Sequence, residues 1–138
     1  VRTELEMDLI EGGLPAEDIP EEWNKRYGEL LGIKPSNDSE GCLQDVHWSE
    51  GAFGYFPSYL LGHLISAQIS SKMENDIGLI DDLVEDGEYE KIVLWLKNKI
   101  HKYGRSVNSM QLVRIVTNEE LTSDYFISHL NSKIKDFC

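Results

Sequence analysis

The sequence predicts an all-α protein. Apolar residues recur at helical spacing through most of its 138 residues. Glycine and proline interrupt that spacing at short intervals, as they do between helices, and only "CLQDVHW" alternates in the manner of a strand. We expect one helical unit over residues 1–138, because no linker-like or repetitive segment divides the chain.

Three helices are expected in the first 75 residues. Residues 2–10 mix acidic and apolar side chains at helical spacing, and "EGG" ends that run. Pro20 suits the first turn of a second helix that continues to residue 31. Its apolar face has the spacing i, i+4, i+7 and i+8, at Trp23, Tyr27, Leu30 and Leu31. A third, longer helix should cover residues 57–75, with a buried side at Leu60, Leu61, Leu64, Ile65, Gln68 and Ile69.

Four further helices are expected in the rest of the chain, after residue 75. A short one should end at a Gly87 turn, and the next should carry a regular apolar face at Ile92, Trp95, Leu96, Ile100 and Tyr103. Gly104 is placed to cap that helix at its C-terminus. Residues 110–116 read as another short helix, and Thr122 can cap a final helix over residues 123–135.

The charge and hydropathy of the chain exclude two classes of protein. It carries 25 acidic and 13 basic residues, a net charge of −12, and no basic stripe, so nucleic-acid binding is not expected. The longest apolar-rich stretch, residues 55–69, is interrupted by Gly62, His63 and Gln68. It is therefore not expected to span or bind a membrane.

The ends of the chain and its cysteines indicate where the protein works. Acidic residues begin at Glu4, so there is no signal-peptide pattern, and the opening at Val1 without methionine suggests a fragment. Cys42 and Cys138 are too few and too far apart for a disulfide framework. A cytoplasmic location follows as the expectation.

No local metal or nucleotide site is predicted. No two of the four histidines lie three or four residues apart, the cysteines form no CxxC, and acidic runs such as Asp81-Asp82 lack the spacing of a calcium loop. GxSxG, GxGxxG and GxxxxGK[ST] are also absent. The histidines are His47, His63, His101 and His129.

Residues 44–59, "QDVHWSEGAFGYFPSY", hold the strongest candidate for chemistry. Tyr55 and Tyr59 lie four residues apart at a helix start, so both phenols could point toward one place. A phenol donates a hydrogen bond without carrying charge, which suits it to an oxyanion, and His47 could add a second donor. Gly51 and Gly54 allow positive φ and a close backbone approach, which makes Gly54 a candidate for substrate contact.

A plain structural interpretation of the same loop stands beside this one. The aromatic residues Trp48, Phe53 and Phe56 fit core packing, and His47 fits a satisfied buried histidine. Residue types alone leave both interpretations open.

The segment "LQDVHWSEGAFGYFPSYLLG", residues 43–62, resembles the signature of the Taq carboxypeptidase family of thermostable zinc metallocarboxypeptidases, QDxHWsxGxfGYFPtYxLG. The upstream residues resemble that family's "R-[FY]-E-[IL]-E" stretch in register, and "WLKNKIHKYGRS" and "LTSDYFISHLNSKI" resemble its C-terminal helices. Ser58 stands where threonine is common, and His63 where asparagine is. The resemblance covers essentially the whole chain.

The resemblance implies the C-terminal part of an all-α, neurolysin-like zinc metallopeptidase whose HExxH region lies upstream of this chain. The implied reaction is release of C-terminal amino acids, with broad specificity, by attack of zinc-activated water. Zinc, or another divalent metal such as cobalt, would belong to the full-length enzyme, and this chain alone would bind no metal and be inactive. The implied partners are peptides with a free C-terminus and a second copy of the enzyme in a homodimer.

The resemblance also implies roles for individual residues. His47 would contact the substrate backbone, and Tyr59, with Tyr55 as a second candidate, would stabilise the oxyanion. Arginine binds a terminal carboxylate best, and Arg2 is the first candidate for that role and Arg105 the second. The alternative for Arg2 is an ion pair with Glu4 or Glu6 on its own helix. The alternative for the whole chain is a non-catalytic interaction or dimerisation module, with Trp23 or Trp95 either in the core or at an interface.

Overall fold

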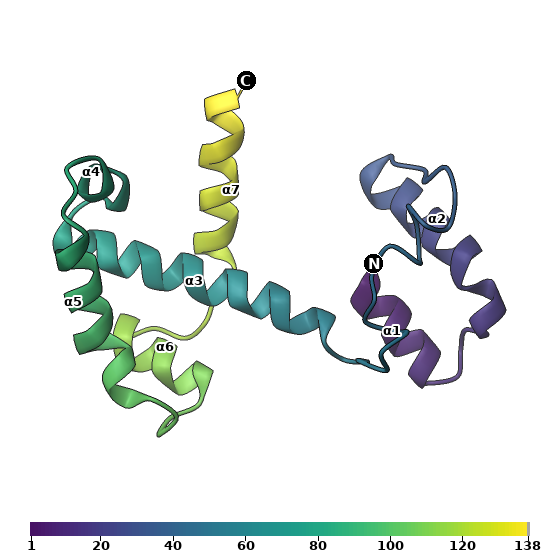
Figure 1. Cartoon of the computed structure of the whole chain (residues 1–138), viewed down its shortest axis with the longest axis horizontal. Coiled ribbons are helices and arrows are strands. Elements are labelled where there is room, and N and C mark those ends of the chain that lie inside the picture. The colour runs from purple at the N-terminus through teal and green to yellow at the C-terminus, as the bar shows by residue number, and fades with distance from the viewer. Residues whose placement is uncertain (138) are drawn as a thin grey trace. The chain divides into compact units, whose positions relative to one another are not determined.

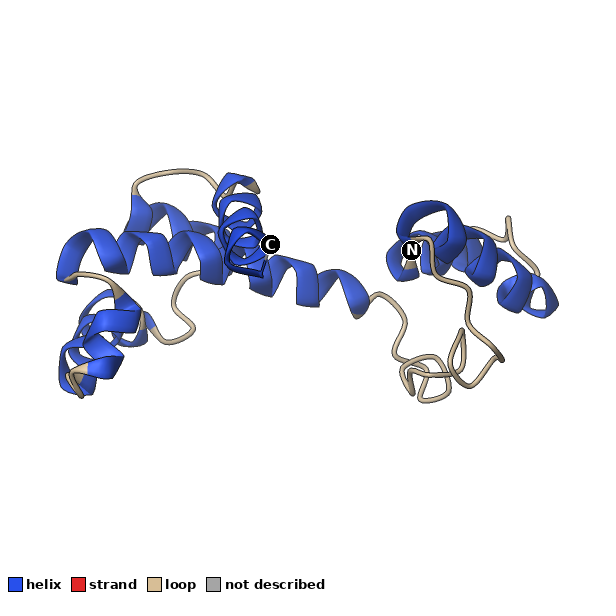
Figure 2. Ribbon diagram, turned by 90° about the horizontal axis from the view of Figure 1, so that it is seen from above, coloured by secondary structure: helices blue, strands red, loops and turns tan. Residues whose placement is uncertain are grey.

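The computed structural model describes residues 1–137, and every regular element in that range is a helix (Figure 2). The all-α prediction is therefore confirmed. The chain divides into two compact units, Val1–Leu60 and Leu61–Cys138. That residues 1–138 act as one domain stays a prediction, and Cys138 lies outside the described residues. None of the described helices is long and apolar enough to cross a bilayer.

The first unit contains the helices α1 (Arg2–Ile10) and α2 (Ile19–Leu31), which Figure 1 shows. The 3₁₀ turn η1 (Ala16–Asp18) leads into α2. Both helices begin and end within a residue of the predicted positions. Gly32 ends α2 in the left-handed conformation, at φ 67°. The "CLQDVHW" segment forms turns rather than a strand.

The longest helix, α3 (Phe56–Ile77), starts at the end of the first unit and continues into the second. It is followed by α4 (Ile80–Glu85), α5 (Tyr89–Lys99), the 3₁₀ turn η2 (His101–Tyr103), α6 (Ser109–Thr117) and α7 (Asp124–Phe137). All the predicted helices are present.

The cap predicted at Gly104 is placed wrongly. The helix α5 ends at Lys99, and Gly104 follows η2 with φ 52°. Ile100, with φ −118°, breaks the α-helical geometry and lets one tighter turn intervene. At the start of α7, the Thr122 hydroxyl accepts a hydrogen bond from the Asp124 backbone N–H at 3.3 Å, so Thr122 helps to cap this helix.

The core of the first unit gathers around Trp23. Leu5, Trp23 and Cys42 are buried there, and the partly buried residues against them are Val1, Leu14, Ile19, Tyr27 and Trp48. Trp23 is thus a core residue. Leu30 and Leu31, which share the apolar face of α2, are 64% and 58% exposed, because this core contacts α2 only as far as Tyr27.

The core of the second unit is formed where α3, α4, α5 and α6 converge. Met73, Trp95 and Val116 are buried at its centre, and Trp95 is thus also a core residue. The predicted apolar face is confirmed at Trp95 and at Ile92, Leu96 and Ile100, which pack against this centre. Tyr103, the last residue of the predicted face, lies in η2 and is not among the residues of this core. Leu60 and Leu61 are exposed, contrary to the prediction for α3, because the packed stretch of that helix begins near Gln68 and Ile69.

Gln68 is a buried polar side chain whose amide is fully used. Its Nε2 donates to the Glu120 carbonyl at 3.0 Å and to the Thr117 hydroxyl at 3.3 Å. Its Oε1 accepts from the Thr122 N–H at 3.1 Å. A buried amide with all these partners fastens the segment between α6 and α7 to α3.

Asp76 connects α3 to the central tryptophan of this core. Its carboxylate accepts from Lys72 Nζ at 2.6 Å and from Trp95 Nε1 at 2.9 Å. These two bonds, the one from Lys72 first, hold the pKa of Asp76 below its ordinary value of 3.8. Stability from this carboxylate is therefore fully present above that value and is lost as the pH falls through the lowered pKa.

We expect Asp76→Asn to lower the free energy of unfolding at pH 7 by about 1 kcal/mol, because a charge-assisted pair of bonds becomes a neutral one. Denaturant unfolding at pH 7 and again well below the ordinary pKa of 3.8 measures this difference. The difference should shrink at the acidic pH, where the native carboxylate is also protonated. An equal difference at both pH values would contradict the role given to the charge.

Candidate functional site

The loop between α2 and α3 is folded by its own backbone hydrogen bonds. The His47 carbonyl accepts from the Ala52 N–H at 2.8 Å, and the Trp48 carbonyl accepts from the Gly51 N–H at 3.1 Å. Gly51 and Gly54 adopt φ 72° and 76°, which only glycine reaches without strain. The predicted need for glycine at these two positions is confirmed, and the chain returns directly into α3.

The start of α3 places two phenols and one imidazole together. The rings of Tyr55 and Tyr59 are 5.3 Å apart between centroids, as the spacing of four residues predicts. The His47 Nε2 and the Tyr59 hydroxyl lie 3.1 Å apart, within hydrogen-bond distance. Both phenols are 50% exposed, so a ligand could reach them. We call His47, Tyr55 and Tyr59 the donor cluster.

The imidazole of His47 also packs against Phe56. The two ring centroids are 4.6 Å apart, and Phe56 is 8% exposed. Phe56 and Trp48 lie edge to face, with ring centroids 6.0 Å apart. Core packing was predicted for both, and it is confirmed for the buried Phe56 and in part for Trp48, which is partly buried against the Trp23 core. Phe53 is 45% exposed and does not belong to the core, since the turn through Gly51 and Gly54 carries it outward.

The two nitrogens of His47 differ in a way that selects a tautomer. Nδ1 is buried and has no hydrogen-bond partner among residues 1–137, while Nε2 faces the Tyr59 hydroxyl. A buried N–H without an acceptor is less favourable than a buried lone pair without a donor. The hydrogen therefore belongs on Nε2, which donates to the Tyr59 oxygen and leaves the phenolic O–H free to donate outward.

The guanidinium of Arg2 contacts the loop that carries His47 rather than the acidic residues of its own helix. Its Nε donates to Asp45 Oδ2 at 2.5 Å, and its Nη1 donates to the Tyr27 hydroxyl at 2.5 Å. The alternative partners on α1, Glu4 and Glu6, take no part in this pairing.

Arg105 lies in the second unit, in the turn after η2. Its side chain is exposed and has no hydrogen bond or ion pair within the described residues. Gly54 is also exposed, and a Cβ built there would meet no atom within 4 Å. The position therefore favours glycine because of its positive φ and not because a side chain would clash.

Among the side chains of residues 1–135, no group of three or more histidine, cysteine, aspartate or glutamate residues could hold a metal ion. His63 stacks on Phe126 at 5.8 Å and takes no part in the donor cluster. The described side chains therefore offer no ligand set for a metal ion.

Three residues that bind Arg2 or Trp48 were not predicted to have these contacts: Asp45, Tyr27 and Glu6. Asp45 and Tyr27 accept from Arg2, and Glu6, only 3% exposed, accepts from Trp48 Nε1 at 3.0 Å. The signal in the sequence was the aspartate of "QDVHW", because a carboxylate that folding partly buries needs a partner.

Comparison with known proteins identifies relatives across nearly the whole chain. Residues 1–134 match the family described as Carboxypeptidase Taq (M32) metallopeptidase. Carboxypeptidase 1 of Bacillus subtilis is 42% identical over 133 residues, which cover 96% of this chain and 26% of that protein. Thermostable carboxypeptidase 1 of Thermus thermophilus is 39% identical over the same length, again 96% of this chain and 26% of the relative.

Solved structures agree with the fold. The crystal structure of BsuCP has a TM-score of 0.90 and 41% identity, covering 98% of this chain and 27% of that one. Metallocarboxypeptidase 1 of Trypanosoma cruzi has a TM-score of 0.88 and 40% identity, covering 95% and 28%. The chain spans about a quarter of the length of the relatives it matches.

Proposed function

The chain belongs to the Carboxypeptidase Taq (M32) metallopeptidase family, and from that premise we propose that it forms part of a metal-dependent carboxypeptidase. In this proposal the substrate is a peptide with a free C-terminal carboxylate, and the donor cluster binds the peptide carbonyl under attack. The observation that supports it is the 3.1 Å contact between His47 Nε2 and the hydroxyl of Tyr59, with Tyr55 packed beside them.

The chemistry of the donor cluster suits an oxyanion. Attack on a peptide carbonyl moves negative charge onto its oxygen, and a donor already aimed at that position stabilises the charge without reorganising. The Tyr59 O–H is free for this role when its oxygen accepts from His47. Tyr55, whose ring centroid is 5.3 Å from that of Tyr59, supplies a second phenol from the same helix start, and His47 and Gly54 complete the surface for the substrate backbone.

The metal of the enzyme would be held outside this chain. The described residues lack a ligand set, while the family is one of metallopeptidases. We propose zinc, bound by an HExxH-bearing region in another part of the full-length protein. The isolated chain should then hydrolyse no peptide.

Arg105 is our candidate for the cation that binds the substrate carboxylate, because its guanidinium is exposed and without a partner among the described residues. In the full-length protein, we expect Arg105→Met to raise KM about 10-fold, with little change in kcat, because a ground-state contact is lost. Steady-state kinetics on an N-blocked dipeptide measures both constants.

Arg114→Met provides the matched control, since Arg114 is an exposed arginine of the same unit that is already paired with Glu120. Its KM should stay within about 2-fold of the wild type, as expected for a surface pair. Equal KM values for the two variants would remove Arg105 from the substrate site.

The proposed function itself is tested with two matched peptides, one ending in a free carboxylate and the other in an amide. The full-length protein should release the C-terminal residue from the first and leave the second intact. Hydrolysis of neither peptide, or of both equally, would contradict carboxypeptidase activity.

We also propose that the full-length enzyme works as a homodimer in the cytoplasm. We further propose that it accepts peptides with a broad range of C-terminal side chains. The support is the family membership, together with an acidic chain in which no described helix could cross a bilayer. Sedimentation of the full-length protein tests the dimer, and a single species of monomer mass would contradict it.

A further inference from the structure

We propose that Arg2 is a positioning residue that holds His47 in register with Tyr59, rather than a ligand of the substrate carboxylate. This inference rests on the proposed function of the donor cluster. It is supported by two separate sets of contacts that lead from the guanidinium to the imidazole.

The first route runs through Asp45. The Arg2 Nε and Asp45 Oδ2 are 2.5 Å apart, and the two side chains are 31% and 27% exposed. Only Val46 separates Asp45 from His47 in the chain. Because α1 is packed into the core through Leu5, a bond from α1 to Asp45 fixes the position of the loop immediately before the histidine.

The second route runs through Phe56. The guanidinium carbon of Arg2 lies 5.6 Å from the centre of the Phe56 ring, and the imidazole of His47 lies 4.6 Å from the same ring between centroids. Arg2 also lies 5.0 Å from the Trp23 ring and 5.9 Å from the Tyr27 ring. A planar cation among three aromatic rings has little freedom to move.

The same contacts make Arg2 a poor ligand for a substrate. Asp45 already balances its charge, and Tyr27 accepts a second hydrogen bond at 2.5 Å. A substrate carboxylate would have to compete with Asp45 for a guanidinium held between rings. Breaking such a pair leaves the remaining carboxylate unpaired and partly buried, which is unfavourable.

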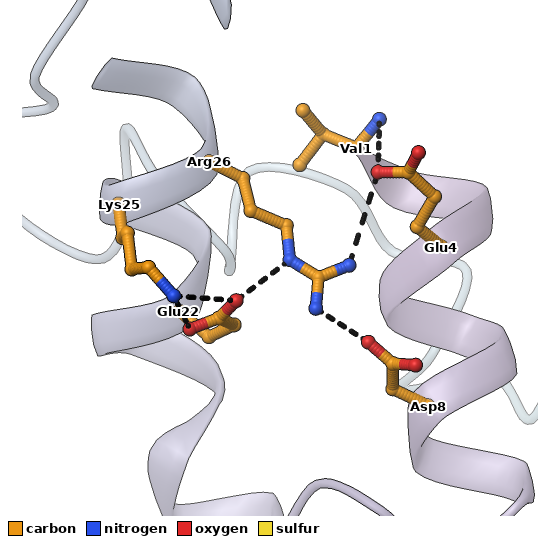
Figure 3. A network of polar contacts seen from close by, with 6 residues as sticks. All are labelled: Val1, Glu4, Asp8, Glu22, Lys25 and Arg26. Atoms are coloured by element: carbon orange, nitrogen blue, oxygen red, sulfur yellow. Dashed lines mark hydrogen bonds and ion pairs between the residues drawn. The ribbon is translucent and has the colours of Figure 1, made fainter. Parts of the chain in front are cut away.

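Arg26 provides a matched control within the same unit, and Figure 3 shows its network. Its guanidinium donates to Asp8 on α1 and to Glu22 at 2.9 Å on α2, and it is 19% exposed. The bonds to Asp8 and Glu22 raise the pKa of Arg26, and the bond from Arg26, followed by that from Lys25, lowers the pKa of Glu22. This arginine thus ties α1 to α2 as Arg2 ties α1 to the loop, but it has no contact with the donor cluster.

The experiment is a double-mutant cycle in the full-length protein, with kcat and KM measured on the N-blocked dipeptide. We expect Arg2→Met to lower kcat about 10-fold with KM nearly unchanged, because a misplaced donor weakens only the transition state. In a Tyr59→Phe background the same substitution should lower kcat by less than about 2-fold, since the donor that Arg2 positions has gone.

Arg26→Met should lower the melting temperature yet leave kcat within about 2-fold in both backgrounds, as a purely structural ion pair does. Asp45→Asn removes the carboxylate that pairs with Arg2. Like Arg2→Met, it should lower kcat in the wild type but by much less in the Tyr59→Phe background. It also provides the test if Arg2→Met does not fold. Arg2→Lys keeps the charge but not the planar fork, and its kcat should fall between those of Arg2→Met and the wild type.

Two results would overturn the inference. Losses from Arg2→Met or Asp45→Asn that add fully to those of Tyr59→Phe would show that Arg2 does not act through the cluster. A raised KM with unchanged kcat would assign Arg2 to substrate binding. Either result is distinct from failure of the proposed function, in which the wild-type protein itself releases no C-terminal residue.

Discussion

Tyr59→Phe in the full-length protein is expected to lower kcat on the order of 100-fold, the loss typical of removing one oxyanion donor. The substitution removes only the hydroxyl, so the ring contacts of Tyr59 with Tyr55 and His47 can remain. KM should change little, because the donor gains strength only as charge develops on the carbonyl oxygen. Steady-state kinetics at saturating substrate measures the effect.

Tyr89→Phe is the matched control for that substitution. Tyr89 is also a tyrosine at the start of a helix, is 58% exposed, and belongs to the second unit, whereas the loop that carries His47 belongs to the first. Its loss of a hydroxyl should leave kcat unchanged. A kcat for Tyr59→Phe equal to that of the control would remove Tyr59 from the reaction.

Trp23→Ala is expected to destabilise the protein by about 3–5 kcal/mol, as truncation of a buried aromatic core residue does. Trp23 is 1% exposed, stacks on Tyr27 at 4.9 Å, and meets Trp48 edge to face at 6.0 Å. Its ring is also one of the three aromatic rings that surround the guanidinium of Arg2. Denaturant unfolding measures the loss, which is a large share of the stability of an ordinary domain.

Trp23→Phe separates the packing of this residue from its polar group. The Trp23 Nε1 is buried and has no hydrogen-bond partner among residues 1–137, so the phenyl ring gives up no hydrogen bond. We expect a loss of less than about half that of the alanine variant, since most of the apolar surface is retained. Equal losses for the two variants would contradict the central place of the ring in this core.

Helical periodicity predicted which face of a helix is apolar, and it succeeded wherever another element covers that face. For α5, the core of the second unit covers Ile92, Trp95 and Leu96, and all three predictions are confirmed. For Leu60 on α3 the same reasoning failed, because Leu60 is exposed. Leu31, on the apolar face of α2, is exposed as well. Spacing shows that a face is apolar, but only the neighbouring elements decide whether it is buried.

In the candidate site, too, features set by neighbouring residues could be predicted from the sequence, whereas contacts between distant residues could not. The proximity of Tyr55 and Tyr59 follows from one turn of helix, and the positive φ of Gly54 follows from its residue type. The bond between Arg2 and Asp45 joins residues 43 positions apart. The loop has no regular residue spacing, so the sequence does not show that Asp45 lies next to Arg2. Spacing along the helix of Arg2 suggested Glu4 or Glu6 as its partner instead.

The central claim is that the His47–Tyr59 pair stabilises the oxyanion of peptide hydrolysis, and binding of a phosphinic peptide that mimics the tetrahedral intermediate tests it most directly. A donor that acts in the transition state must also bind such an analogue. Titration calorimetry on the full-length protein should give Tyr59→Phe a loss of affinity on the order of 100-fold, matching its loss in kcat/KM, with binding of the product peptide unchanged. An affinity equal to that of the wild type would contradict the claim.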